Sequence, residues 1–170
     1  MKQATDSTTL HTAATWSPPQ APFLKINYDG AVLQDSNYAG LGAVIRDSVG
    51  GVLTSLTENI PLPQTMADME AVAARKAIML TRDLNLTSII LEGDSEIITR
   101  AIQAKEQSLA SYGNLIEEIR KYANSFLNVR ISHVKRKGNF VTHSLARHAR
   151  HVSSLVVWME EVPSHILPVL

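Results

Sequence analysis

The sequence predicts a single α/β domain in which a run of strands comes first and helices alternate with strands afterwards. Apolar residues alternate with polar ones in much of the first 60 residues, as in β-strands, and then recur at helical spacing. The second part reads helix, strand, two helices, strand and helix, and strands joined by a crossover helix pair in parallel. A chain of 170 residues is the size of one domain. We therefore expect a five-stranded mixed sheet, three antiparallel strands followed by two parallel ones.

The antiparallel part comes first in the chain. The expected strands cover residues 23–32, 39–46 and 52–60. In the first of them Leu24, Ile26 and Tyr28 share one side, which is the period of a half-buried strand. The glycine-containing turn at 47–51 joins the other two as a hairpin. Residues 1–22, with three prolines and many small polar residues, are expected to be a flexible lead-in.

The rest of the domain alternates helices with short apolar strands. We expect helices over 64–84, 95–104, 112–124 and 139–151, and strands over 87–91 and 129–134. Pro63 immediately precedes the first helix, Asn85 suits its end, and Ser95 is a natural N-cap of the second. The domain should therefore span 23–151, and residues 152–170 should form an apolar tail packed on it or extending it.

Composition excludes several classes of protein. The chain has no Cys, which rules out a disulfide scaffold, a thiol nucleophile and a Cys-based zinc site. No apolar run approaches the roughly 20 residues of a membrane span, so we expect no membrane partner. The N-terminus lacks the apolar core of a signal peptide, which favours an intracellular protein, nuclear or cytoplasmic, over a secreted one.

Charge is balanced overall but not along the chain. Lys and Arg number 16, as do Asp and Glu, yet the segment 119–159 contains eight basic residues and no acidic one. A polyanion responds to the charge of the surface that it approaches, not to the net charge of the whole protein. The segment is therefore either a nucleic-acid surface or an ordinary solvated helix face with a basic turn.

Three carboxylates occupy positions where a structural role is hard to find. Asp29 lies near the end of the first strand, Glu70 on the apolar face of the first helix, and Asp94 after the fourth strand. Singly, each has an ordinary alternative role, as a turn residue, a boundary residue or a helix cap. Together they would repel one another unless a cation lay between them, and such hard oxygen ligands suit Mg²⁺ or Mn²⁺. Paired metals at such a site can cleave phosphodiesters.

Several short motifs surround these acids in a fixed order. They are Trp16-Ser17-Pro18-Pro19, Lys25-Ile26-Asn27-Tyr28-Asp29-Gly30-Ala31, Gly40-Leu41-Gly42-Ala43-Val44-Ile45-Arg46-Asp47, Met69-Glu70-Ala71, Glu92-Gly93-Asp94-Ser95, His133-Val134-Lys135-Arg136-Lys137-Gly138-Asn139 and Leu145-Ala146-Arg147. In this order the sequence resembles the type 1 ribonuclease H family, most of all the ribonuclease H-like domain of plant non-LTR retroelement reverse transcriptases. The resemblance covers about residues 16–170 and rests on order and spacing.

The resemblance implies a ribonuclease H-like fold, with helices on both faces of the sheet, and a metal-dependent endonuclease. That family cleaves the RNA strand of RNA–DNA hybrids with two divalent cations, here Mg²⁺ or also Mn²⁺, held by four acids. The resemblance implies that Asp29 binds both cations and that Glu70 and Asp94 bind one of them. The fourth acid belongs in the last helix, where this chain has His143. Imidazole is a poorer ligand for Mg²⁺ and carries no negative charge, so activity could be weakened.

The resemblance also suggests residues that contact the substrate. His133 lies close to where many members carry a mobile catalytic histidine, although a solvent-facing residue at a strand end is an equal alternative. Backbone groups near Gly30 and Ala31 would contact RNA 2′-hydroxyls, and Ser95 would add a phosphate contact to its capping role. Further nucleic-acid contacts are expected from Lys135, Arg136, Lys137, Asn139 and Arg147.

Three hypotheses follow. The leading one is a ribonuclease acting on RNA–DNA hybrids. The second is a domesticated nucleic-acid-binding module of retroelement origin whose nuclease has lapsed, and the third is a structural or protein-interaction remnant. Because the chain lacks a Lys- and Trp-rich protrusion before the fifth strand, we expect it to bind a hybrid weakly on its own and to use a fused or separate polymerase. We expect a monomer.

Overall fold

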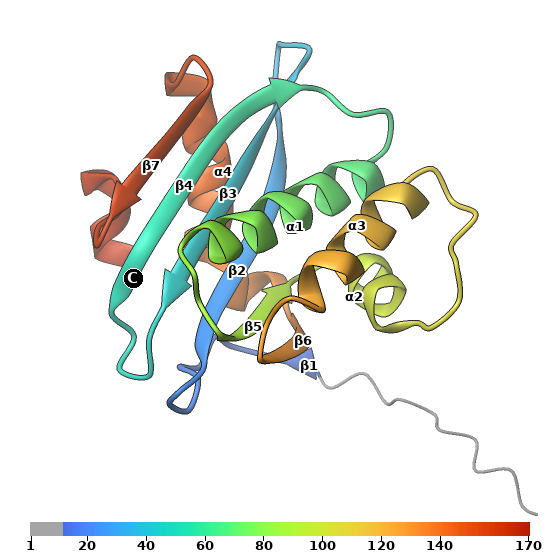
Figure 1. Cartoon of the computed structure of the whole chain (residues 1–170). Helices are drawn as coiled ribbons and strands as arrows, with labels where there is room; N and C mark the ends of the chain where they lie inside the picture. Colours follow the sequence, from blue (N-terminus) through green and yellow to red (C-terminus); the bar gives the residue numbers. More distant parts are fainter. Residues whose placement is uncertain (1–11) are drawn as a thin grey trace, which may run out of the picture.

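The sheet is the centre of the molecule, and it has seven strands in the order β1-β6-β5-β2-β3-β4-β7 (Figure 1). The structure is a computed structural model, and it describes residues 12–170. The strands are β1 (Thr12–Ala13), β2 (Leu24–Leu33), β3 (Tyr38–Arg46), β4 (Val52–Pro61), β5 (Ser88–Gly93), β6 (Asn128–Val134) and β7 (Leu155–Met159).

The five predicted strands are all present with the predicted directions. β2, β3 and β4 form an antiparallel meander, while β5 pairs in parallel with β2 and β6 in parallel with β5. The expected count of five is nevertheless wrong, because a short strand is added at each edge. β1 pairs in parallel with β6, and β7 pairs antiparallel with β4.

Helices cover both faces of the sheet (Figure 1). On one face lie α1 (Met66–Asp83), α2 (Glu96–Gln103) and α3 (Gly113–Ala123), and on the other lies α4 (Phe140–His148). The expected last helix over 139–151 is divided, since α4 is flanked by the 3₁₀ turns η1 (Arg136–Asn139) and η2 (Ala149–His151). A third 3₁₀ turn, η3 (Ser164–Val169), ends the chain. No helix in the described part of the chain is long and apolar enough to cross a bilayer.

The packing of α1 explains how an acid can approach the sheet. Its sheet-facing residues are small, with Ala73, Ala74 and Ala77 fully buried against the core that contains Ile26 and Tyr28. Small side chains bring the helix axis close to the strands, so a longer side chain one turn earlier reaches β2. The N-cap is Thr65, whose hydroxyl accepts the backbone N–H of Asp68 at 3.0 Å.

The packing of α4 depends on two glycines of β3. A Cβ at Gly40 would lie 1.8 Å from the carbonyl oxygen of Ala146, and one at Gly42 would lie 2.3 Å from that of Thr142. Neither position has room for a side chain, so the helix lies directly on the strand backbone. Gly42 is also the cross-strand partner of Asp29, so α4 lies over the part of the sheet that contains this acid.

Both ends of the described chain contact the domain. Trp16 donates its indole N–H to Asn27 at 2.9 Å and stacks on the guanidinium of Arg46. Residues 12–22, which belong to the expected lead-in, are thus joined to the sheet, while residues 1–11 lie outside the described residues. At the other end Val162 and Ile166 are buried in a second core beneath α4.

Candidate functional site

Three carboxylates converge just beyond the point where the parallel pairing of β2 with β5 ends. Asp29 comes from β2, Glu70 from the second turn of α1, and Asp94 from the residue that follows β5. One oxygen of each lies within 4.8 Å of the others, and in the described part of the chain this is the one group of acids and histidines so closely placed. The structure therefore brings together the three acids that the sequence analysis selected.

The backbone of Gly30 connects two of the acids. Its N–H donates to Asp29 Oδ1 at 2.9 Å and to Glu70 Oε1 at 3.3 Å. A Cβ at Gly30 would lie 2.7 Å from the side chain of Met69, so a larger residue here would push α1 away. The second oxygen of Glu70 is buried and has no hydrogen-bond partner. An orphaned carboxylate oxygen beside two further acids is a natural cation ligand.

The electrostatics of the cluster favour a bound cation. Burial raises the pKa of Glu70 to about 10, and the charges of Asp29 and Asp94 add to the rise. Burial and the charge of Asp29 also raise the pKa of Asp94 to about 6, against the lowering effects of Arg136 and His143. Without a metal, the cluster therefore carries less than its full negative charge at neutral pH. A divalent cation would reverse this by favouring the ionised acids.

His143 lies at the fourth corner of the cluster. Its Nδ1 is 2.8 Å from Asp29 Oδ2, and the ring N–H is the donor because a carboxylate accepts. The close packing of α4 on Gly42, the cross-strand partner of Asp29, brings His143 near that acid. Asp29 itself is buried, with 3% of its surface exposed. His143 therefore contacts the cluster through Asp29, while the group of oxygens within 4.8 Å of one another consists of the three acids.

His133 does not take the role expected of a mobile or solvent-facing histidine. It is 8% exposed, and both ring nitrogens are hydrogen-bonded. Nε2 lies 3.1 Å from the main-chain oxygen of Asp94, and Nδ1 lies 2.8 Å from the hydroxyl of Thr12. Because a carbonyl can only accept, Nε2–H donates to Asp94 and a neutral ring accepts from Thr12. His133 therefore holds the chain at Asp94 and does not point into the cluster.

Two other predicted site residues have structural roles. The Ser95 hydroxyl accepts the N–H of Ile98 at 3.3 Å, as an N-cap of α2. Asn139 was expected to contact nucleic acid, but it is 1% exposed and donates to the carbonyl of Tyr28 at 2.9 Å. That expectation is wrong, because the amide joins the start of α4 to β2 and is covered by them.

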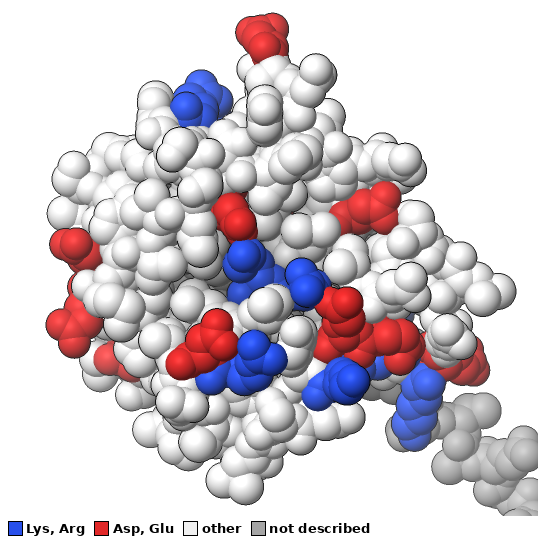
Figure 2. All heavy atoms as spheres, turned by 45° about the horizontal axis from the view of Figure 1, so that its top comes forward, with Lys and Arg blue, Asp and Glu red and all other residues white. Residues whose placement is uncertain are grey.

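A groove of about 480 Å³ opens beside the acids. Four of the residues expected to contact substrate line it, namely Gly30, Ala31, Arg136 and Arg147. His143, which contacts Asp29, lines it as well, whereas Asp29, Glu70 and Asp94 themselves are not among the lining residues. Lys135 and Lys137 are exposed but do not line it. On the face shown in Figure 2, Lys and Arg side chains lie among Asp and Glu and do not form a separate basic surface.

Two further residues of this region were not predicted from the sequence. Arg150 lines the groove together with Arg147. The signal was present, since the two arginines are three residues apart in a helical segment and so share a face. Thr12, the partner of His133, could not be found in this way, because 121 residues separate the two.

Solved structures share this fold. RNase H1 from the halophilic archaeon Halobacterium salinarum matches with a TM-score of 0.69 and 22% identity, covering 76% of this chain and 98% of its own. The RNase H domain of a Mycobacterium tuberculosis protein matches with 0.67 and 20% over 76% and 94%. LC11-RNase H1, isolated from compost and solved with an RNA/DNA hybrid, gives 0.65 and 22% over 74% and 95%. The fold is therefore ribonuclease H-like, as predicted.

The sequence itself identifies the family. Residues 27–149 match the family described as reverse transcriptase-like, and this range includes all three acids, His133 and His143. The chain therefore belongs to the reverse transcriptase-like family. No curated protein sequence matches it.

Proposed function

We propose that this protein is a metal-dependent endonuclease that hydrolyses the RNA strand of RNA–DNA hybrids with two divalent cations. The observation that carries the proposal is the convergence of Asp29, Glu70 and Asp94 within 4.8 Å beside a groove lined by arginines. LC11-RNase H1, which shares the fold, was solved with an RNA/DNA hybrid. A buried cluster of this kind destabilises the domain unless it binds something.

The residues present fit divalent cations. Asp29, Glu70 and Asp94 would supply carboxylate oxygens, among them the unpartnered Oε2 of Glu70, and His143 would stand at the fourth position. Oxygen ligands favour Mg²⁺ and Mn²⁺, and the imidazole shifts the preference towards Mn²⁺. When bound, such cations neutralise the charge of the phosphate and assist its attack by water.

The groove residues would hold the substrate. Arg147 and Arg150 present guanidinium groups that can pair with phosphates of the strand, and Arg136 lines the same groove and lowers the pKa of Asp94 by its charge. The N–H of Gly30 already donates to two acids, so Gly30 would contribute by letting the substrate approach the backbone closely. Ala31, as the next small residue of the groove, would allow a ribose to lie against β2 and its 2′-hydroxyl to be recognised.

We infer an origin in a retroelement of the plant non-LTR type, and hence a partner polymerase. The support is the order of motifs, together with the departure at His143. In the segment that contains α2 and α3, Arg120 donates hydrogen bonds to the carbonyls of Ala101 and Glu106, so its guanidinium is not free to bind DNA. A separate or fused polymerase would supply the missing affinity.

A cleavage assay tests the proposal. Wild type should cut the RNA strand of a labelled hybrid in Mn²⁺ and more slowly in Mg²⁺, and Asp29→Asn should abolish the cutting. The matched control is Asp83→Asn, which removes an exposed acid at the far end of α1 and should leave the rate unchanged. Activity that survives Asp29→Asn would refute the proposed site.

The hydrogen bond between His143 and Asp29 favours a second candidate, a nucleic-acid-binding module whose nuclease has lapsed. The ring occupies an oxygen that would otherwise face a cation. This candidate expects salt-sensitive binding of a hybrid with no cutting in either metal. Binding without cleavage would therefore select it over the nuclease.

A further inference from the structure

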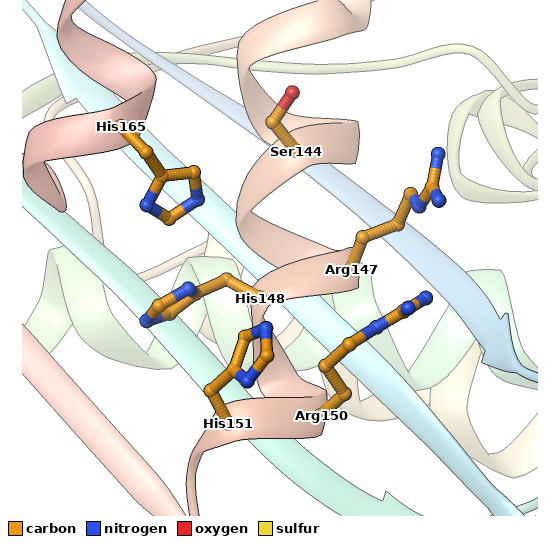
Figure 3. A pocket seen from close by; sticks show the side chains of 6 residues that line it. All are labelled: Ser144, Arg147, His148, Arg150, His151 and His165. Carbon is orange, nitrogen blue, oxygen red and sulfur yellow. The ribbon is translucent and has the colours of Figure 1, made fainter.

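Three histidines lie together at the end of α4, apart from the acidic cluster. His148 ends α4, His151 ends η2, and His165 belongs to η3. The ring centroids of His148 and His165 are 4.8 Å apart, and those of His148 and His151 are 5.5 Å apart. Figure 3 shows the three rings gathered on one side of the helix, whereas Arg147 and Arg150 point to the other side.

The fold holds these rings near one another. His148 ends α4 and His151 ends the 3₁₀ turn that follows directly, so the two are three residues apart and lie on the same side. His165 is brought to them by the next residue, because Ile166 is buried in the core beneath α4. The three histidines line a pocket of about 270 Å³, large enough for an ion and its water, together with Ser144 and with Arg147 and Arg150, whose guanidinium groups point away from the rings.

His148 is the histidine of the cluster whose surroundings favour a neutral ring with an unused nitrogen. Burial lowers the pKa of His148, and the neighbouring His165 and His151 lower it further. Its Nδ1 is buried and has no hydrogen-bond partner. A neutral imidazole with an unused nitrogen is the form that binds transition metals.

We propose that His148, His151 and His165 bind one divalent transition-metal ion, of which Zn²⁺ is the expected type, and that the ion fastens the C-terminal segment to α4. Two imidazoles on one zinc ion, each with Zn–N near 2.0–2.1 Å, have ring centroids about 5 Å apart. The two measured separations lie on either side of that value. The nitrogens do not yet meet within 4.8 Å, so rotation of the exposed His151 and His165 side chains would complete the site.

This site differs from the acidic cluster in the metal that it takes. Imidazole ligands suit Zn²⁺, Cu²⁺ and Ni²⁺, whereas carboxylate ligands suit Mg²⁺ and Mn²⁺. The two sites are also on different parts of α4, because His143 faces Asp29 while His148 faces the C-terminal segment. The proposal therefore does not depend on nuclease activity.

The test is a titration of the chelator-treated full chain with Zn²⁺ in the presence of excess Mg²⁺, followed by calorimetry and by the thermal unfolding midpoint. We expect one Zn²⁺ per chain, a higher midpoint, and full retention of both effects in Asp29→Asn. Co²⁺ in place of Zn²⁺ should give the visible absorption of a nitrogen-ligated ion.

The histidine variants identify the ligands. His151→Ala and His165→Ala change exposed residues and should each weaken Zn²⁺ binding at least tenfold, roughly the loss seen when even an outer-shell partner is removed. Ser164→Ala, next to His165, is the matched control and should bind as wild type does. Zinc affinity that persists in both histidine variants, or that disappears in Asp29→Asn, would overturn the proposal.

Discussion

At the scale of single residues, Glu70 is the acid whose protonation would change most if the cluster bound a metal. In the metal-free protein its pKa is raised to about 10, mainly by burial. The folded state therefore holds a proton that the unfolded state releases near pH 4.5. The stability that this proton contributes is complete below pH 4.5 and is lost as pH rises towards 10. Metal should restore it by binding the ionised form.

Glu70→Gln tests this reasoning. The amide keeps the shape of the side chain but cannot ionise, so the variant should unfold at a higher temperature than wild type at pH 8 in a chelator, by a few degrees. At pH 5 the two midpoints should approach each other. The variant should also lose the stabilisation by Mn²⁺ that wild type shows. Thermal unfolding from pH 5 to 9 measures both effects, and a wild-type midpoint that rises with pH relative to the variant would contradict the assignment.

Under the proposed function, His143 would set the metal preference of the cluster. His143→Asp restores a fourth carboxylate beside Asp29 and should raise cleavage in Mg²⁺ about tenfold or more, because Mg²⁺ prefers oxygen ligands. The ratio of rates in Mg²⁺ and Mn²⁺, measured on one hybrid, is the decisive quantity. Ser144→Asp adds the same charge at the next position of α4 and should leave the ratio unchanged. An unchanged ratio in His143→Asp would mean that the imidazole is not at a ligand position.

At the scale of elements, β1 supports the site through one hydrogen-bonded chain. Thr12 contacts His133, and His133 donates to the carbonyl of Asp94. A positioning residue of this kind should affect metal binding more than folding. His133→Ala should therefore weaken Mn²⁺ binding about 10- to 100-fold, and Thr12→Ala should weaken it less.

The conservative variant separates positioning from simple packing. His133→Gln keeps a donor for the Asp94 carbonyl and should recover part of the Mn²⁺ affinity that His133→Ala loses. Calorimetric titration with Mn²⁺, together with the unfolding midpoint of each variant, checks this. If affinity falls only in proportion to the midpoint, then His133 merely packs.

The elements differ in how well periodicity predicts them. The helix around Ala73 and Ala77 was predicted because it buries one face through many residues, and the strand around Ile26 because apolar residues alternate along it, although the structure buries both of its faces. β1 has two residues, too few to show a periodicity of apolar residues. β7 lies in a short apolar segment that fits an irregular tail as well as a strand. The three acids were predictable because charge on an apolar face is costly. The burial of His133 and Asn139 was not, because it depends on partners more than 100 residues away.

At the scale of the whole molecule, the basic residues of the segment 119–159 divide into those that stabilise the fold and those that line the groove. Arg120 donates to main-chain oxygens at the end of α2, and Arg130 stacks on Phe23, so both serve the fold. Of the eight basic residues in 119–159, three line the groove beside the acids: Arg136, Arg147 and Arg150. The surface that would meet a hybrid is therefore smaller than the sequence suggests.

This division predicts a specific salt dependence. Binding that releases counterions has a slope of log affinity against log salt of about −0.9 per phosphate contact in a duplex. Replacing Arg136, Arg147 and Arg150 by Ala should make the slope of hybrid binding less steep by roughly 2 to 3. The matched control replaces Arg75, Arg82 and Arg100, which removes the same charge from ion pairs outside the groove. Fluorescence anisotropy of a labelled hybrid at several salt concentrations measures both. If the slope becomes less steep by the same amount in both triple variants, the hybrid responds to net charge and the groove does not bind it. If the change is confined to the variant of Arg136, Arg147 and Arg150, the phosphate contacts lie beside Asp29, where hydrolysis would have to occur.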